Sequence, residues 1–521
     1  AGALPGAPRG GGWCARCGAG GREWVTGLFL RVPATDDVRL VRAALDTLKA
    51  RHEALRTRFT TAGGRDGEPV QVVDPPGPME LRTVTAPRAK AGEVVEEDAA
   101  EGFDLENGPV VRALLVDDPG TGDGPAGPAP DRTLVLLMHH IVGDGWSATV
   151  LREEFHEVVG ALREGRRPLL SELPVQYADF AVWQRERLTE EVVARELAHW
   201  RAVLDGAAPL TLRSDLPRPP ARDARGAVVT FTVPAAVAQA VGRLGRRGGV
   251  TPFTVLLTAF TTLLARYTAQ WDVVVGTPVA GRERPEIENV VGFFLNSLVL
   301  RCRLDGSLTF DQAVERVGEV CKDAFGHQEL PFEELVAELA PERDPSRTPL
   351  YQVAFDYHDA ELTGSAADAA DLDTVTAVSS VAKTDLTLYM RGQSDGTLVG
   401  ALEYATSLFA RPTVERFAGH FQRLLESVAA DPRGRLDTLD ILTDGERADL
   451  ARWSTAPAPE VTASVPALFG RRAAAEPDAT ALVADGVEVT FAALEARANR
   501  LARALRNLSL INNSEPPRRR D

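Results

Sequence analysis

The sequence predicts an α/β protein with two lobes, because apolar strand-like runs alternate with helical segments in both halves of the chain. In the first half, a buried strand expected at 134–138 leads through a glycine-containing turn into a helix expected at 148–165. In the second half, residues 251–270 have the pattern of a buried helix, with Thr251 as N-cap and Pro252 at the first position. The strand-like run DVVVGTPVAG follows this helix. A cleft between two such lobes is a common place for a substrate site.

The expected borders of the lobes come from changes in composition along the chain. The first lobe, residues 23–212, contains an amphipathic helix at 37–51, with Thr35 or Asp36 available as its N-cap. A connector rich in proline and arginine begins after this lobe, so we place the boundary just before it. The second lobe is expected to cover residues 213–442.

Composition and charge exclude several classes of protein. The 521 residues are 44% hydrophobic, which is enough core for at least two substructures. Four cysteines do not make a disulfide framework in so long a chain, which indicates a reducing, cytoplasmic compartment. No stretch approaches the ~20 apolar residues of a membrane span, and the N-terminus lacks the apolar core of a signal peptide. The net charge of −16 would repel phosphate backbones, so we expect neither nucleic acid nor a membrane as partner.

The run MHHIVGDGWS, residues 138–147, places two histidines and an aspartate at a strand end. The ordinary pKa of histidine, about 6.5, suits proton transfer near neutrality, and a strand end beneath a loop is where a rigid scaffold presents such a group. We expect Asp144 to fix the turn by pairing with an arginine elsewhere in the chain. The structural alternative is that one histidine is a core residue and Asp144 only a turn former.

This pattern resembles the active-site motif of the condensation domains of non-ribosomal peptide synthetases. Five further motifs occur in the order of that family: RHEALRTRF at 51–59, YADFAVW at 177–183, VGFFLNSLVLR at 291–301, HQELPFE at 327–333 and RDPSRTPL at 343–350. A lone HHxxxDG would be weak evidence, whereas six motifs in order are strong evidence. The resemblance covers residues 23–442, which is most of the chain.

The resemblance implies a fold and a reaction. Each lobe is expected to resemble a chloramphenicol acetyltransferase subunit, and the two lobes to form a V-shaped pseudodimer with a tunnel between them. The reaction is the attack of an aminoacyl amine on an upstream acyl or peptidyl thioester, which forms a peptide bond. Both substrates are held by 4'-phosphopantetheine arms on an upstream donor and a downstream acceptor carrier protein, so the chain itself is expected to bind no cofactor. The motifs at 51–59, 138–147 and 291–301 look most like the subtype that joins two L-configured residues.

The resemblance also suggests roles within the histidine motif. His140 is the candidate to accept the amine proton or to orient the amine nitrogen, and both roles stay open. His139 is expected to be structural, since consecutive side chains at a strand end point to opposite faces. Arg282, in the turn GTPVAGR, is the expected partner of Asp144, because the family uses a comparable pair to hold the loop. The N–H of Gly145 is placed either to stabilise a developing oxyanion or only to form the turn.

Five other residues are expected to support the site. Of Trp146 and Ser147, one is expected to pack and the other to cap the following helix. Arg51 and Arg56 lie in a motif that the family places near the active-site channel, although a surface helix charge is the simpler interpretation. Asn296 falls in a segment that resembles the bridge over the tunnel, where its amide is expected to bond the backbone of the other lobe.

Segments at both ends differ from a condensation domain. Residues 443–460 are polar with several prolines and are expected to be a linker. Residues 461–508 resemble the opening of an adenylation domain without its phosphate-binding loop, so an adjacent adenylation domain is an expected partner, and the tail 509–521 matches nothing known of that family. Residues 1–22 are rich in glycine and proline where the family has its opening motif, and their CxxC has no second pair at a zinc spacing, so we expect no metal site. A truncated gene with a shifted reading frame or a mis-called start would explain both ends.

Related families fit the sequence less well. A cyclisation domain would have aspartates in place of the histidines, and an epimerisation domain would not normally run directly into an adenylation domain. Plant-type acyltransferases carry a second, aromatic-glycine motif that the sequence lacks. Two alternatives of another kind stay open: a non-catalytic module that docks carrier proteins or enzymes, and an inactive gene fragment.

Overall fold

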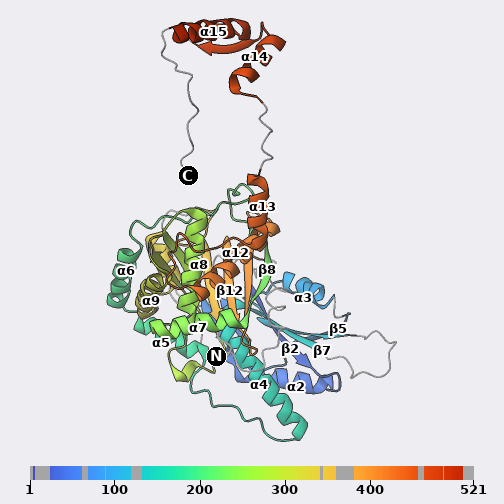
Figure 1. The fold of residues 1–521 in the computed structure, drawn as a ribbon. Coiled ribbons are helices and arrows are strands. Elements are labelled where there is room, and N and C mark those ends of the chain that lie inside the picture. The colour runs from blue at the N-terminus through green and yellow to red at the C-terminus, as the bar shows by residue number, and fades with distance from the viewer. Residues whose placement is uncertain are drawn as a thin grey trace. The chain divides into compact units, whose positions relative to one another are not determined.

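The structure, a computed structural model, describes nine stretches of the chain (Figure 1): residues 4–5, 24–61, 69–87, 90–118, 132–340, 344–358, 381–455, 463–484 and 486–507. It contains two compact units, residues 1–443 and 444–521, and each is described by itself. The CxxC of residues 14–17, Arg343 in the last of the family motifs and the tail 509–521 lie outside the described residues.

The first half of the larger unit contains a four-stranded sheet whose inner strand leads into the histidine motif. Its strands lie in the order β2 (Val25–Val32), β7 (Arg132–His139), β6 (Val111–Asp117) and β5 (Leu81–Thr85). β7 is antiparallel to both of its neighbours, and β6 and β5 are parallel. Because β7 has a strand on each side and both of its faces are covered, its apolar run 134–138 is buried, as predicted.

Helices cover both faces of this sheet. α2 (Val38–Arg51) packs against α4 (Gly145–Glu164) on one face, and α3 (Ala91–Ala100) contributes to the core on the other. Alternate residues of β7 follow this division. The core under α2 and α4 contains Leu134, Leu136 and Met138, and the core under α3 contains Val135 and Leu137.

The N-cap of α2 differs from the prediction. The side chain of Asp37 accepts a hydrogen bond from Arg39 N at 2.9 Å, in place of the predicted Thr35 or Asp36. Asp36 is engaged elsewhere, in an ion pair with Arg163 of α4. The remaining elements of this half are the 3-10 helix η2 (Glu53–Arg56) and a small sheet of β1 (Leu4–Pro5), β4 (Val70–Val73) and β3 (Thr57–Thr60).

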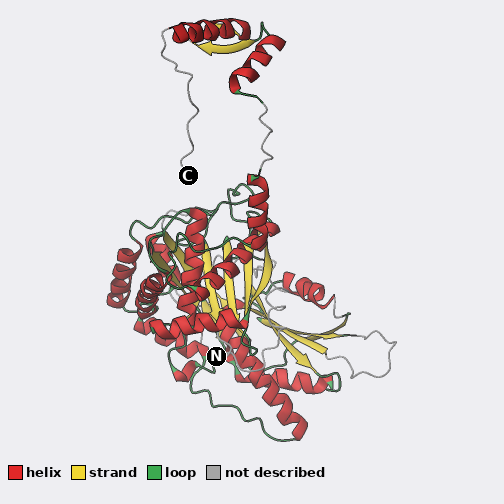
Figure 2. Cartoon of the chain, viewed as in Figure 1, coloured by secondary structure: helices red, strands yellow, loops and turns green. Residues whose placement is uncertain are grey.

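The second half of the larger unit is built on a six-stranded mixed sheet. Its strands lie in the order β10 (Asn296–Arg303), β9 (Asp272–Val279), β11 (Val353–His358), β12 (Leu386–Gly392), β13 (Leu398–Ala405) and β8 (Gly226–Val233). β11 is parallel to β9 and to β12, and the other pairs are antiparallel. The helices that pack against one another and against this sheet (Figure 2) are α7 (Ala235–Gly248), α8 (Pro252–Thr268), α9 (Phe310–Gly326) and α12 (Arg411–Ala430). α8 begins as predicted, with Thr251 as N-cap and Pro252 at its first position.

The two halves have separate hydrophobic cores, and these divide the chain differently from the predicted boundary between residues 212 and 213. Trp200 of α6 (Glu190–Leu204) packs in the second core, and so does Leu210. In the opposite direction, Val291 and Phe294 of the second half pack in the first core. Each half therefore sends a segment into the other. The remaining elements of the unit are α5 (Tyr177–Arg187), η6 (Pro285–Ile287) and α10 (Phe332–Leu339).

The smaller unit begins with a helix, α13 (Asp444–Ser454), so the first part of the predicted linker 443–460 is helical. Acidic residues in its first turn favour this start, and the prolines come only after the helix. The other elements are α14 (Val465–Ala475), β14 (Thr480–Ala484), β15 (Val487–Thr490) and α15 (Phe491–Asn507). β14 and β15 form an antiparallel hairpin, and Gly486 in its turn has a φ of +76°, which favours glycine. Phe469 and Phe491 join α14 to α15, with ring centroids 5.5 Å apart.

Within the stretches given above, no single helix has both the length and the apolarity of a membrane span. α7 and α8 reach these values only as a pair, which is bent by 107° at its junction.

Candidate active site

The histidine motif forms the connection between β7 and α4. β7 ends at His139, the 3-10 turn η5 (His140–Val142) follows, and α4 begins at Gly145. Gly143 is required in this turn, because a Cβ there would come within 2.6 Å of the Met138 sulfur. A Cβ at Gly145 would meet no described atom within 4 Å, so the start of α4 has open space beside it.

His139 is fully buried and belongs to the core of the first half. Its Nδ1 accepts a hydrogen bond from Ile141 N at 3.1 Å, which places the ring proton on Nε2. The ring makes an edge contact with Phe103, a residue of the core under α3, at a centroid distance of 6.4 Å. Burial lowers the pKa of His139 to about 4, so the side chain is neutral at pH 7.

His140, the next residue, is only half-buried. Its Nδ1 lies 3.0 Å from the carbonyl oxygen of Gly143, and because a carbonyl only accepts, Nδ1 carries the ring proton and Nε2 the lone pair. Burial lowers the pKa of His140 to about 4, and Lys383 adds to this shift, so the ring is neutral at pH 7. An edge contact with Phe293, at a centroid distance of 5.1 Å, fixes the ring. His140 therefore presents the form that a general base or a hydrogen-bond acceptor needs.

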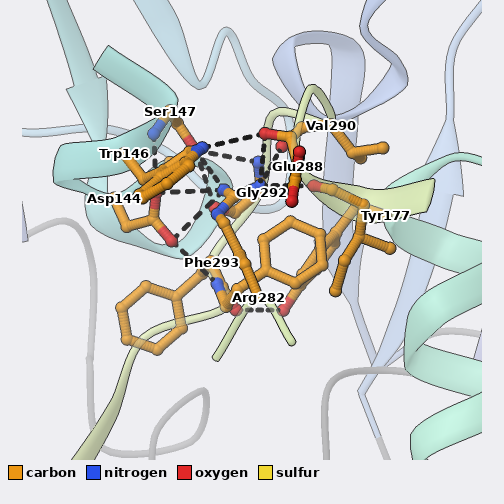
Figure 3. Close-up of polar contacts among 12 residues, drawn as sticks. Asp144, Trp146, Ser147, Tyr177, Arg282, Glu288, Val290, Gly292 and Phe293 are labelled. Atoms are coloured by element: carbon orange, nitrogen blue, oxygen red, sulfur yellow. Dashed lines mark hydrogen bonds and ion pairs between the residues drawn. The ribbon is translucent and has the colours of Figure 1, made fainter. Parts of the chain in front are cut away.

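Asp144 connects the start of α4 to a segment of the second half (Figure 3). It is the N-cap of α4, and its Oδ1 accepts a hydrogen bond from Ser147 N at 2.8 Å. Its Oδ2 accepts a hydrogen bond from Phe294 N at 3.1 Å. The expected ion pair with Arg282 is present, with 3.2 Å between Nη2 and Oδ1, and both side chains are almost completely buried. Asp144 thus fixes the turn through contacts with both halves of the unit.

Arg282 gathers the loop that follows β9. Its Nη1 donates to the carbonyl oxygens of Ile287 and Val290, each at 2.7 Å. The guanidinium carbon lies 4.1 Å from the centroid of the Phe294 ring. Burial lowers the pKa of Arg282 and Asp144 opposes this shift, so the guanidinium stays charged at pH 7. One side chain therefore holds the loop and the start of α4 together.

Ser147 and Trp146 take other roles than we predicted. Because Asp144 is the N-cap, Ser147 lies at the third helical position, where its Oγ is 2.7 Å from Asp144 Oδ1 and accepts a hydrogen bond from Gly292 N at 3.1 Å. Trp146 is 38% exposed instead of packed in a core, and its Nε1 donates to the carbonyl of Glu288 at 2.8 Å. Both residues thus join α4 to the loop that Arg282 holds (Figure 3).

Tyr177 and Gly292 make contacts that sequence reasoning did not assign. The hydroxyl of Tyr177 donates to the carbonyl of Phe293 at 2.8 Å, and its ring makes an edge contact with Phe294 at 5.1 Å. A Cβ on Gly292 would come within 2.2 Å of the Tyr177 ring, so this position accepts only glycine without a rearrangement. The motifs YADFAVW and VGFFLNSLVLR contain these residues, but nothing in the sequence indicates that the two motifs touch.

Arg51 and Arg56 bind within the first half. Arg51 Nε lies 3.0 Å from Glu154 Oε1, which joins the end of α2 to α4. Arg56 Nη1 donates to the carbonyl of Asp74 at 2.5 Å. Their interpretation as surface helix charges is wrong, because these partners leave both side chains mostly buried.

Asn296 bonds the backbone of its own half, not that of the other lobe as we predicted. Its Nδ2 donates to the carbonyls of Gln328 and Leu330, at 2.9 and 2.8 Å, and its Oδ1 accepts from Phe332 N at 3.0 Å. The reason is that β10 lies beside the connection between α9 and α10, whose backbone groups are the nearest partners of the amide.

A pocket adjoins the Asp144–Arg282 cluster and shares Phe294 with it. α5 provides one wall and the loop after β9 the other. Its aromatic lining includes Phe180 and Trp183, and Arg284 lies over the Trp183 ring at 4.7 Å. The pocket therefore combines an apolar wall with a cation at its side, which is a usual composition for a ligand site.

A family model, that of the condensation domain, matches residues 15–451. The chain belongs to the condensation domain family. One of the linear gramicidin synthase proteins of Brevibacillus parabrevis is 40% identical to this condensation domain chain over 488 residues, which is 91% of the chain and 6% of that protein. The chain thus spans a small fraction of the length of the curated relatives it matches.

Solved structures confirm the predicted α/β fold of this condensation domain. The first condensation domain of the calcium-dependent antibiotic synthetase covers 85% of the chain and is itself covered completely, with a TM-score of 0.70 and 23% identity. A four-domain nonribosomal peptide synthetase bound to AMP and glycine covers 98% of the chain, with a TM-score of 0.73 and 20% identity, and 39% of that protein is covered. Both likenesses, at these identities, show the fold alone.

Proposed function

We propose that this chain forms a peptide bond by attack of a carrier-bound aminoacyl amine on an upstream carrier-bound acyl or peptidyl thioester. The observation that carries the proposal is the neutral His140, whose Nε2 has its lone pair available at the start of α4. Membership of the condensation domain family and the similarity to gramicidin synthase support it. The 4'-phosphopantetheine arms would be supplied by an upstream donor and a downstream acceptor carrier protein.

His140 orients the attacking amine in this proposal. An α-amino group has a pKa of about 7.7–8.0, so part of it is already deprotonated at neutral pH, and holding it against a thioester supplies much of the rate. A ring whose pKa is about 4 is a weak acceptor for a full proton but a suitable hydrogen-bond acceptor for an amine N–H. Nε2 would therefore accept one N–H of the amine and direct the nitrogen lone pair toward the thioester carbon.

The backbone N–H of Gly145 would stabilise the oxyanion that forms on the thioester carbonyl. As the first helical residue of α4, Gly145 has one of the N–H groups that lack an acceptor inside the helix, at the positive end of the helix dipole. Asp144 and Arg282 are positioning residues in this scheme, because they fix the start of α4 without touching the reacting atoms.

The pocket beside the site would take the arm of one of the carrier proteins. Its aromatic wall suits the alkyl part of a phosphopantetheine arm, and Arg284 suits its phosphate. Chain segments from both halves border this pocket.

The remaining proposals concern the setting of the domain. We assign it to the subtype that joins two L-configured residues, and residues 461–508 to the start of an adenylation domain. Two facts support the second assignment: the smaller unit is compact by itself, and the match with the four-domain synthetase includes it. A cytoplasmic location fits the low cysteine content.

Reconstitution tests the proposed function. The full chain is incubated with a donor and an acceptor carrier protein, each loaded with an L-aminoacyl group, and intact-mass spectrometry detects the dipeptidyl acceptor. We expect transfer from L-configured donors and strongly reduced transfer from the D-configured counterparts. The absence of transfer with every loaded pair would contradict the proposal and favour the docking module, which the family match does not otherwise favour.

A further inference from the structure

Three side chains that the proposed reaction does not use meet where α6 lies beside the end of α9. They are His199 of α6, Asp323 of α9 and His327, the residue after α9, and one ligand atom from each lies within 4.8 Å of the others. Asp323 and His327 are four residues apart, so the helix places them on one face. His199 reaches them from a different element, and its Nε2 lies 3.4 Å from Asp323 Oδ2.

His327 is held in the state that a metal ligand needs. Its Nδ1 lies 2.8 Å from Glu196 Oε2, and a carboxylate only accepts, so Nδ1 carries the proton and Nε2 has the lone pair. Glu196 is buried and is itself held by Arg195 at 2.8 Å. Histidine ligands of metals commonly donate their second N–H to a carboxylate in this way, which fixes the ring and raises its basicity.

His199 supplies an observation of a different kind. Its Nε2 is buried and has no hydrogen-bond partner among the described residues. Buried polar atoms are nearly always satisfied, so a buried ring nitrogen without a hydrogen bond, beside a carboxylate and a second imidazole, indicates a missing partner. The rings of His199 and His327 are stacked, with centroids 3.6 Å apart and planes at 11°. Parallel rings do not direct both lone pairs at one ion, so binding requires one ring to tilt, and His199 is the ring that no hydrogen bond restrains.

We propose that His199, Asp323 and His327 bind one Zn²⁺ ion. Two imidazole nitrogens and one carboxylate oxygen are a usual donor set for zinc, and a water would complete the tetrahedron. Hard cations such as Mg²⁺ prefer oxygen ligands and fit this set poorly. The site departs from our expectation of no metal, which considered only the CxxC segment.

The ion would clamp α6 to the segment that follows α9. His327 is the first residue of that segment, and the carbonyls of Gln328 and Leu330 receive the amide of Asn296. Trp200, next to His199, donates to the carbonyl of His327 at 3.2 Å, so one direct contact already joins the same two elements. A bound ion would therefore stabilise the packing of α6 on the second half.

Calorimetric titration of the full chain with ZnCl₂ tests the site, in a Cys14→Ser/Cys17→Ser background that removes the competing thiol pair. We expect one equivalent of Zn²⁺ to bind and to raise the Tm, and MgCl₂ at the same concentration to leave the Tm unchanged. Co²⁺ should bind with a visible spectrum that lacks thiolate charge-transfer bands. Failure of this background to bind stoichiometric Zn²⁺ would overturn the proposal.

Substitutions assign the ligands. His199→Ala and Asp323→Asn should each abolish the stoichiometric heat and the Zn²⁺-dependent rise in Tm, and Asp323 is exposed enough for its variant to keep the fold. Glu196→Gln should weaken binding by about 10- to 100-fold, as expected when the carboxylate behind a ligand is lost. The control is His358→Ala, which removes an exposed histidine that pairs with one aspartate and should leave Zn²⁺ binding intact. Undiminished binding in His199→Ala and Asp323→Asn would show that the zinc lies elsewhere and would contradict the assignment.

Discussion

Two pairs of histidines in this protein reach opposite arrangements. His139 and His140 are consecutive in the chain, yet His139 is fully buried against Phe103 and His140 is only half-buried. His199 and His327 are far apart in the chain, yet their rings stack at 3.6 Å. The alternation of side chains at a strand end separates the first pair, whereas the packing of α6 beside α9 brings the second pair together.

This comparison shows that adjacency in the chain is a poor guide to shared function. The two rings of the strand-end pair have the proton on different nitrogens, because Nδ1 of His139 accepts a hydrogen bond and Nδ1 of His140 donates one. We therefore expect substitutions of the two to have separable effects, one on stability and one on transfer. The contacts of the residues around them, from the strongest to the weakest, provide ways to break or sharpen this view.

The largest effect on stability is expected for Asp144→Ala. The change leaves Arg282 buried without its carboxylate, and breaking a buried pair in this way typically costs about 3–5 kcal/mol. Urea denaturation of the full chain measures the loss. The matched control is Asp437→Ala, which breaks a surface pair with Arg435 and should cost less than about 1 kcal/mol. An Asp144→Ala variant that unfolds at the parental urea concentration would show that the junction is not structural.

The second effect is a pH dependence caused by His139. Its pKa in the folded protein is about 4, below the ordinary 6.5 of the unfolded chain, so between these values only the unfolded state takes up the proton. The stability that this group contributes is complete above pH 6.5 and is lost as the pH falls to 4, by about 3 kcal/mol at about 1.36 kcal/mol per pH unit. His139→Gln keeps a hydrogen-bond acceptor but does not titrate, so its free energy of unfolding should fall less between pH 7.5 and 4.5. Equal slopes in parent and variant would contradict the burial of a neutral His139.

A third, smaller effect is expected for Gly292→Ala. The added methyl group collides with the Tyr177 ring, and overpacking of this kind typically costs about 1–3 kcal/mol. Gly160→Ala is the control, because it adds the same group in α4 where no described atom lies within 4 Å, and alanine favours the helix. If both variants keep the parental Tm, the approach of the loop to α5 is looser than the contacts indicate.

The smallest effect is expected for Asn296→Ala, which leaves the carbonyls of Gln328 and Leu330 without their donor. Because the site is only partly buried and water can replace the amide, the cost should be about 1 kcal/mol. Hydrogen–deuterium exchange should become faster in the segment after α9. Asn107→Ala, which removes an exposed amide bound to Asp104, is the control and should leave that exchange unchanged. Faster exchange confined to the first half would instead support the bridge to the other lobe.

Local features of the sequence were sufficient to predict several elements. The apolar run before the histidines, the glycine turn and the helix after it all depend on near neighbours in the chain, and so does the start of α8 at Thr251 and Pro252. The division of His139 and His140 between two environments follows from the same local geometry. The pairing of Asp144 with Arg282 was predicted only through the family resemblance, because nothing local selects that arginine.

Features that depend on tertiary packing could not be predicted. The pattern of α6 shows which of its faces is apolar, but not that Trp200 packs in the second core. The sequence offers Asp144 and Ser147 as equally good caps, and only the position of Gly292 and Arg282 shows that Ser147 Oγ is used by the loop of the second half. The amide of Asn296 likewise takes the partners that the fold brings nearest.

Peptide transfer by His140→Ala and His139→Gln, measured side by side with loaded carrier proteins by intact-mass spectrometry, tests the central claim most directly. We expect His140→Ala to keep the parental Tm and to lose about 10²- to 10⁴-fold in transfer rate, because the group that directs the amine is gone. We expect His139→Gln to transfer at a rate close to that of the parent at neutral pH, within the limits of its altered stability. Near-parental transfer by a folded His140→Ala variant, or an equal loss in a folded His139→Gln variant, would contradict the division of roles between the two histidines.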